Sequence, residues 1–338
     1  MKILLIGGTG RISAAVTRLA LQMGIEVYLL NRGNRSAKAP EGVVHLRGDI
    51  NDEAQVASLL KEHYFDAVAN FINFVPSQVE RDIRLFAGRT NQYLFISSAS
   101  AYQKPLSNFK ITESTPLANP FWEYSRNKIV CEELLMAEHR KTGFPVTIVR
   151  PSHTYDETTV PVGIHGQKGS WQVMKRMIEG KPILVHGDGL SLWTLTHSDD
   201  FAKGFNGLLG NVRTIGEAIH ITSDESLTWN TIHNLIAREL GVKPKFCHVT
   251  TDFLAKADPG LEGALMGDKS HSVVFDNSKI KSLVPDFAAT IRFDIGIREP
   301  VAYFLANKEM QQEDPDFDRF TEKVIRAMDE AGKTLVND

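Results

Sequence analysis

A tyrosine and a lysine stand four residues apart in the segment WEYSRNK, at Tyr124 and Lys128. If this segment is helical, positions i and i+4 lie on the same side, so the phenol and the ammonium can act on one small volume. A lysine charge lowers the pKa of a neighbouring phenol, which can then exchange a proton with a substrate oxygen. The same spacing also arises by chance, so its meaning depends on what the rest of the chain builds around it.

A second segment that could form part of a functional site is GGTGRIS, which directly follows an apolar run at the start of the chain. Gly7 and Gly10 are three residues apart, and Ser13 fills the third place of the pattern. Glycine is needed where a strand turns tightly into a helix and where a pyrophosphate approaches main-chain N–H groups. Between a strand and a helix, this spacing predicts a dinucleotide site. The predicted contacts in the turn are Gly7, Thr9, Gly10, Arg11 and Ile12.

The residues after the second apolar run indicate which dinucleotide binds. A carboxylate there would accept the ribose 2′-hydroxyl of NAD and repel a 2′-phosphate. The sequence LLNRGNR instead has Asn31, followed by Arg32 and Arg35. Guanidinium groups pair well with phosphate, so the pattern favours NADP, with NAD as the alternative. Asp49 and Ile50, in the segment GDI, are predicted to contact the adenine.

Apolar runs alternate with helical patterns through the first half of the chain and predict the elements that hold these residues. This rhythm is typical of βα units on a parallel sheet. The sequence therefore predicts an α/β fold with a doubly wound parallel sheet of Rossmann type and a smaller C-terminal α+β lobe. The predicted strands are residues 2–6, 26–30, 43–50, 65–72, 92–98 and 144–152, and the predicted helices are 11–24, 52–63, 77–88 and 124–140.

The rhythm changes after Pro151. Residues 152–170 read as a loop punctuated by glycine and proline, and loops of that length tend to be functional or mobile. We expect a dinucleotide-binding domain over residues 1–160, to which 195–222 returns, and a substrate-binding lobe over 161–330. In the second part, helices are predicted at 171–180, 230–240 and 296–308, short strands at 183–187 and 216–223, and a charged surface helix in the tail.

The bulk composition argues against several classes of protein. A chain of 338 residues with 42% hydrophobic residues buries a sizeable core. With a net charge of −3, the chain does not have the broad positive field that nucleic-acid-binding proteins usually have, so nucleic acid is not expected as a partner. Cys131 and Cys247 are far apart and indicate neither a disulfide framework nor a metal site. No apolar stretch reaches about 20 residues, so we expect no membrane span and a cytoplasmic location.

Taken together, the motifs resemble the extended short-chain dehydrogenase/reductase family, which includes sugar-nucleotide epimerases and dehydratases. The resemblance covers nearly the whole chain, through GGTGRIS, GDI, ISSASAY, YSRNK, IVRPSHTY and THSDDFA. It implies that Ser98, Tyr124 and Lys128 are catalytic. Lys128 would hold the nicotinamide ribose, Tyr124 would transfer a proton while hydride moves to or from the nicotinamide, and Ser98 would fix the substrate oxygen. It also implies that the nicotinamide half of the groove is lined by Phe71, Ile72 and Pro151.

Departures from the family pattern bear on the substrate. Where the sugar-nucleotide enzymes grip a diphosphate with an asparagine and an arginine, this chain has His153 and Trp193. An indole in place of a guanidinium removes an anion clamp and leaves an apolar wall. Trp122 and Glu123 precede Tyr124, where the family usually has a proline just before the tyrosine. We therefore expect a hydroxyl- or carbonyl-bearing small molecule other than a conventional nucleotide-diphosphate sugar, contacted by Trp122, His153 and Trp193.

The resulting hypothesis is an NADP-dependent oxidoreductase, epimerase or dehydratase, without a metal and with a homodimer as an open expectation. Two other classes stay open. RPSHTY and the Trp193 segment resemble the chloroplast stem-loop-binding proteins, a branch of this fold that is linked to RNA and looks to lack the tyrosine–lysine pair. A cofactor-sensing regulator is the other, although it would not need catalytic residues. His197 is a further acid/base candidate, and Asp200 is expected to brace the structure.

Overall fold

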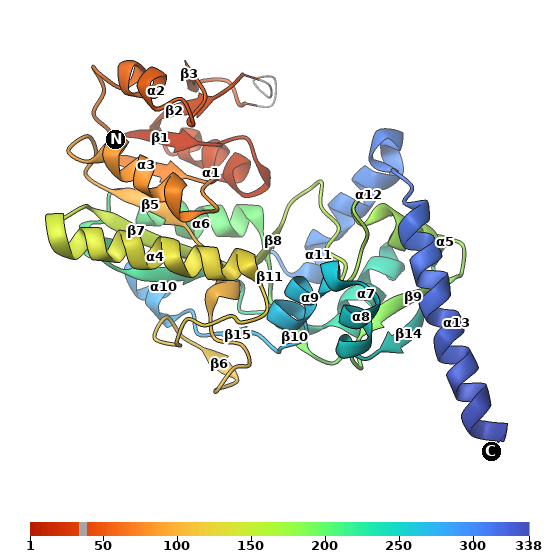
Figure 1. Cartoon of the computed structure of the whole chain (residues 1–338). Coiled ribbons are helices and arrows are strands. Elements are labelled where there is room, and N and C mark those ends of the chain that lie inside the picture. The colour runs from red at the N-terminus through yellow and green to blue at the C-terminus, as the bar shows by residue number, and fades with distance from the viewer. Residues whose placement is uncertain (34–38, 338) are drawn as a thin grey trace. The chain divides into compact units, whose positions relative to one another are not determined.

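The computed structural model describes residues 1–33 and 39–337 of the chain (Figure 1). The chain folds into two compact units. The first comprises Met1–Asp156, Thr194–Glu225 and Val274–Ile291, and the second comprises Glu157–Trp193, Ser226–Val273 and Arg292–Asp338. Residues 274–291 therefore lie in the first unit, whereas the sequence interpretation included them in the second lobe.

A seven-stranded parallel sheet forms the centre of the first unit, in the order β12-β7-β5-β4-β1-β2-β3. The predicted doubly wound α/β fold is thus confirmed. Every strand except β3 is almost wholly buried, as expected of a parallel sheet covered on both faces. The strands are β1 (Lys2–Ile6), β2 (Glu26–Asn31), β3 (Val44–Arg47), β4 (Ala67–Asn70), β5 (Tyr93–Ile96), β7 (Val146–Pro151) and β12 (Ala218–Ile221).

Alternate residues of β1 enter two separate cores. Ile3 and Leu5 pack with helices α1 (Arg11–Gln22) and α6 (Ser198–Leu208), while Leu4 and Ile6 pack with α2 (Glu53–Leu59) and α3 (Pro76–Phe86). Helix α4 (Glu123–Thr142) covers the second face, to which it contributes Cys131 and Leu135, and it ends at Gly143 in the left-handed conformation, with φ of 78°. Helix α10 (Ser278–Leu283) adds Ile280 to the first face.

Short strands complete the first unit. Strand β8 (His153–Tyr155) pairs in parallel with β11 (Leu195–His197), and β6 (Lys110–Ile111) pairs in parallel with β15 (Val274–Phe275). The second pairing draws residues 274–291 into this unit. It joins segments more than 160 residues apart through two residues each, so no local pattern in the sequence indicates it.

The second unit is smaller and mixes helices with short strands. Strand β9 (Pro182–His186) pairs in parallel with β14 (Lys245–Val249), and β10 (Leu192–Trp193) pairs antiparallel with β13 (Leu227–Thr228). No helix among the described residues is long and apolar enough to cross a membrane. The main helices are α5 (Trp171–Ile178), α7 (Trp229–Glu239), α8 (Thr251–Ala257), α11 (Phe293–Gly296), α12 (Arg298–Ala306) and α13 (Pro315–Asn337).

The charged tail forms the long helix α13, and its first half is anchored. Phe317 and Val324 are buried, and the Arg176 guanidinium, only 1% exposed, bonds to Asp318 at 2.7 Å. From Arg326 to Thr334 the side chains are exposed. The tail is thus a surface helix, as expected, but its beginning is fixed by a buried cation.

Candidate active site

The turn between β1 and α1 contains Gly7 and Gly10, as the sequence predicts. Gly7 has φ of +77°, and a Cβ on it would lie 2.7 Å from Cγ2 of Ile72, so only glycine fits. Ser13 accepts a hydrogen bond from the Gly10 N–H at 2.9 Å and donates to the Gly7 carbonyl at 2.6 Å. No acidic residue occupies the first turn of α1, so the positive end of this helix is available to an anion.

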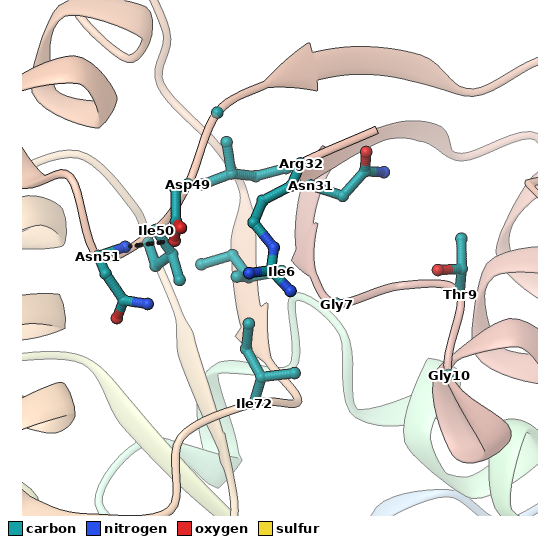
Figure 2. Close-up of a pocket in the computed structure, with 12 residues that line it drawn as sticks. Ile6, Gly7, Thr9, Gly10, Asn31, Arg32, Asp49, Ile50, Asn51 and Ile72 are labelled. Atoms are coloured by element: carbon teal, nitrogen blue, oxygen red, sulfur yellow. Dashed lines mark hydrogen bonds between the residues drawn. The ribbon is translucent and has the colours of Figure 1, made fainter. Parts of the chain in front are cut away.

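A pocket of about 470 Å³ opens beside this turn, at the carboxyl edge of the sheet (Figure 2). Ligands of open α/β sheets bind at this edge. Most of the predicted cofactor contacts come together here, including both glycines of the turn and the residues after β2 and β3. The lining consists of Ile6, Gly7, Thr9, Gly10, Leu30, Asn31, Arg32, Gly48, Asp49, Ile50, Asn51 and Ile72.

Arg32 and Asp49 reach the pocket from adjacent strand ends. In Figure 2 the Arg32 side chain extends over the pocket among Asp49, Ile50 and Ile72. Its guanidinium has no ion-pair partner among the residues that the structure describes. The Asp49 carboxylate accepts a hydrogen bond from the Asn51 N–H at 3.0 Å, which orients it at the pocket rim.

Apart from Tyr124 and Lys128 on α4, four predicted cofactor contacts among the described residues do not line this pocket. Arg11 is exposed at the first residue of α1, and Ile12 packs on the core beneath. Phe71 is directed to the same core, with its ring 5.4 Å from that of Phe205, and Pro151 is buried at the end of β7. Arg35 lies outside the described residues.

Lys128 is a buried cation on α4. It is 2% exposed, and its ammonium donates to the carbonyl oxygens of Asn73 at 2.5 Å and Ile96 at 2.7 Å. The rings of Phe74 and Phe95 lie 4.9 and 5.0 Å from it. Burial lowers the pKa of Lys128 to about 8, a shift that nearby negative groups only partly oppose. Asn73 directly follows Ile72, so this ammonium is bonded to the loop that forms one wall of the pocket.

Tyr124 lies one turn earlier on the same face of α4. The Lys128 ammonium is 5.7 Å from the centroid of its ring, so the two residues share one helix face, as the spacing predicts. The Tyr124 ring is partly exposed and packs at 4.9 Å against the ring of Trp122, the residue before the helix begins. Trp122 therefore borders the candidate catalytic tyrosine.

Ser98 is linked to α4 through other serines. Its hydroxyl lies 2.9 Å from that of Ser100, which accepts a hydrogen bond from Ser125 at 2.8 Å. Ser125 follows Tyr124 in the first turn of the helix. The structure thus brings the loop after β5, which carries Ser98, into contact with the beginning of α4.

A buried polar network behind Lys128 was not predicted. Asp82 has no exposed surface and forms an ion pair with Arg81 at 2.7 Å. Its carboxylate also accepts hydrogen bonds from the side chains of Asn70, Asn73 and Tyr93, at 2.6, 2.7 and 2.6 Å. Arg81 also donates to Asn73 at 2.9 Å and to the pocket residue Asn51 at 2.8 Å. The network therefore connects the pocket with the residue whose carbonyl binds Lys128. Its sequence signal is Asp82 itself, at an apolar position of the amphipathic pattern of α3.

The predicted substrate contacts are more dispersed. His153 is half-buried at the start of β8 in the first unit. Trp193 belongs to the second unit, where it is 3% exposed with its ring 5.2 Å from that of Trp229. The strand pairing of β10 with β13 thus places the indole in the core of that unit, not on an open surface.

The two remaining candidates cap and brace helices. His197 is buried, and its ring nitrogen accepts a hydrogen bond from the Asp199 N–H at the start of α6. Asp200 accepts hydrogen bonds from the Ile291 N–H and the Lys203 ammonium, both at 2.7 Å. A structural role, as expected for Asp200, therefore accounts for both side chains.

Known proteins share this sequence pattern and fold. The sequence model of the NAD dependent epimerase/dehydratase family matches residues 3–222. The chain is 26% identical over 241 residues to 2'-dehydrokanamycin reductase from Streptomyces kanamyceticus, covering 71% of this chain and 67% of that protein. It is 26% identical over 261 residues to the chloroplast stem-loop binding protein of 41 kDa b from Arabidopsis thaliana, covering 73% and 65%. The match thus spans about two thirds of each relative.

The dTDP-glucose 4,6-dehydratase of Bacillus anthracis, solved with NAD, has a similar fold, with a TM-score of 0.70 and 20% identity. The match covers 91% of this chain and 98% of that one.

Proposed function

Because the chain belongs to the NAD dependent epimerase/dehydratase family, whose members include reductases, epimerases and dehydratases, we propose that it is an NADP-dependent oxidoreductase or epimerase/dehydratase. The observation that carries this proposal is the position of Lys128. A buried ammonium beside Tyr124 is bonded to Asn73, next to the pocket wall at Ile72. Lysine is costly to bury, and strongly perturbed groups of this kind cluster at functional sites.

The residues around the pocket fit a dinucleotide. The glycine turn and the free N-terminus of α1 suit a pyrophosphate, and Asp49 and Ile50 suit an adenine. The end of β2 has Asn31 in place of a carboxylate, and the exposed Arg32 after it adds positive charge, so this edge favours NADP. NAD is the alternative, since the similar Bacillus anthracis enzyme was solved with NAD.

Each catalytic residue has a distinct part in this proposal. Bound NADP supplies or accepts the hydride. The Tyr124 phenol passes a proton to or from the substrate oxygen, and Ser98 holds that oxygen by a hydrogen bond. The Lys128 cation favours the ionised phenol, and the one N–H that is not bonded to Asn73 or Ile96 is offered to the nicotinamide ribose. Phe71, Pro151, Arg11 and Ile12 remain proposed cofactor contacts, although they do not line the pocket described above.

We take the substrate to be a hydroxyl- or carbonyl-bearing small molecule other than a nucleotide-diphosphate sugar. Its support is the absence of an anion-binding arginine at Trp193 and the aromatic border that Trp122 forms beside Tyr124. One relative is named a reductase of 2'-dehydrokanamycin, while others are named for dTDP-glucose. Purified protein should therefore oxidise NADPH with cyclic hydroxyketones and not with nucleotide-linked 4-ketohexoses. The reverse preference would contradict this substrate class, and activity with neither would count against the reductase form.

RNA binding is the second candidate, because one relative is named a stem-loop binding protein. The net charge of −3 and the retained tyrosine–lysine pair argue for the enzyme instead. Filter binding with a stem-loop RNA separates the two. Retention that survives moderate salt would favour RNA, whereas retention that disappears would leave only weak electrostatic attraction. The homodimer implied by the family resemblance is tested by sedimentation.

A further inference from the structure

A second arginine lies beside the pocket, at the carboxyl end of β3. The register of the sheet pairs Arg47 with Asn31, the last residue of β2. Paired residues of neighbouring parallel strands point to the same face of the sheet, because side chains alternate with period two along both. Arg47 therefore leaves the sheet on the face that carries the Asn31 side chain.

The Arg47 guanidinium lies directly against the main chain that follows Arg32. A Cβ on Gly33 would be 3.1 Å from Nε and 3.4 Å from Cζ of Arg47. Gly33 has φ of +85°, where glycine is favoured, and its missing side chain leaves room for the guanidinium. Two arginines, one directly after β2 and one at the end of β3, thus flank one turn at the pocket rim.

Neither of these cations is neutralised by a residue that the structure describes. Arg32 and Arg47 are both exposed, and neither side chain has an ion pair or hydrogen bond with any residue in the described ranges. Other arginines of this unit do have such partners, as Arg84 does in Glu53 at 2.8 Å. Two unpaired guanidinium groups beside a pocket provide a site for an anion.

The turn also contains an unused donor. The Asn31 amide oxygen accepts a hydrogen bond from the Gly33 N–H at 2.9 Å, which fixes the orientation of the side chain. Its Nδ2 is buried and has no hydrogen-bond partner in the described part of the chain. A buried donor without an acceptor is costly, and a ligand oxygen would remove that cost.

From these contacts we propose that Arg47, with the Asn31 amide, binds the 2′-phosphate of NADP and determines the preference for NADP over NAD. Arg32 has a different part, since Figure 2 shows its side chain over the pocket while the Asn31 amide points to the other side. In that position the flat Arg32 guanidinium covers the adenine face. The inference rests on the proposed use of NADP and adds a residue that the pattern after β2 does not contain.

Calorimetry of the full chain with adenosine 2′,5′-bisphosphate and 5′-AMP tests the inference without involving the catalytic residues. The two probes differ only in the 2′-phosphate. Arg47→Ala should weaken binding of the bisphosphate by about 10- to 100-fold and leave 5′-AMP within about twofold. Arg47→Lys should retain part of the difference, because a point charge remains but the fork is lost. NADPH and NADH should repeat the pattern.

Arg84→Ala is the matched control, since it removes an exposed arginine of the same unit and should change neither affinity. Equal weakening of both probes by Arg47→Ala, or no weakening, would overturn the role of Arg47. If Arg32→Ala alone abolished the preference, the use of NADP would stand and this inference would fail. If the wild-type chain bound both probes equally, the proposed NADP preference itself would fall.

Discussion

The Lys128 ammonium lies 5.7 Å from the centroid of the Tyr124 ring, one turn farther along α4. Hydrogen bonds to the carbonyl oxygens of Asn73, in the loop after β4, and Ile96, at the end of β5, fix the position of this ammonium. Because both bonds go to main-chain atoms, the cation has a defined position before any ligand arrives. The ring of Tyr124 thus lies beside a cation that is bonded to the last residue of β5 and to the loop that contains the pocket residue Ile72.

Lys128 should give the reaction a pH limit. Burial holds its pKa near 8, so the cation predominates below that pH and is lost above it. We expect kcat/KM for carbonyl reduction, which reports groups of the free enzyme, to fall above about pH 8. A profile that stayed flat to pH 10 would show that this ammonium does not assist the reaction.

The same titration should be visible in stability. Between about pH 8 and 10.5 the unfolded chain holds a proton on Lys128 that the folded chain has released. The free energy of unfolding therefore increases as the pH rises through this interval. Relative to Lys128→Met, the wild-type protein should therefore become more stable across this interval in urea titrations. A constant difference between the two proteins would contradict the lowered pKa.

Removal of the Asp82 charge should destabilise the protein strongly. Asp82→Asn leaves the Arg81 guanidinium, itself 6% exposed, without its carboxylate, and breaking a buried pair in this way costs about 3–5 kcal/mol. Glu53→Gln is the control, because its pair with Arg84 is exposed to solvent and its loss should destabilise the protein far less than the loss of the buried pair. Similar unfolding free energies for both variants would mean that the network contributes little.

Gly7→Ala should abolish cofactor binding, whereas Gly24→Ala should not. Both glycines have positive φ, at +77° and +74°, so both substitutions cost about 1 kcal/mol of backbone strain. Only at Gly7 does the new Cβ meet a neighbour, Cγ2 of Ile72 at 2.7 Å, whereas nothing lies within 4 Å of Gly24. NADPH titration of both variants checks this, and equal affinities would show that the turn does not contact the cofactor.

Local patterns were sufficient for the sheet and the glycine turn. Apolar runs such as residues 2–6 are buried on both faces, so composition alone marks them as central strands. The third predicted strand, 43–50, was too long, since β3 ends at Arg47 and Gly48 begins the pocket wall. That Tyr124 and Lys128 share one face of α4 is predicted by the helical period alone.

Features that depend on distant segments could not be read in the same way. The partners of Asp82 come from β4, the loop after it and β5, so only the misplaced charge in α3 hinted at the network. Arg47 joins Asn31 through strand register, which no sequence pattern specifies. The predictions for His197 and Trp193 rest on residue type. In the structure His197 caps α6, and the pairing of β10 with β13 determines the contacts of Trp193.

The central claim is that the Tyr124 phenol transfers the proton, and single-turnover kinetics of Tyr124→Phe with bound NADPH tests it most directly. Phenylalanine keeps the ring and removes only the hydroxyl, and Tyr64→Phe at an exposed position is the control. We predict that Tyr124→Phe binds NADPH with unchanged affinity and oxidises it about 10²- to 10⁴-fold more slowly with substrate present. Wild-type rates in Tyr124→Phe would contradict the claim.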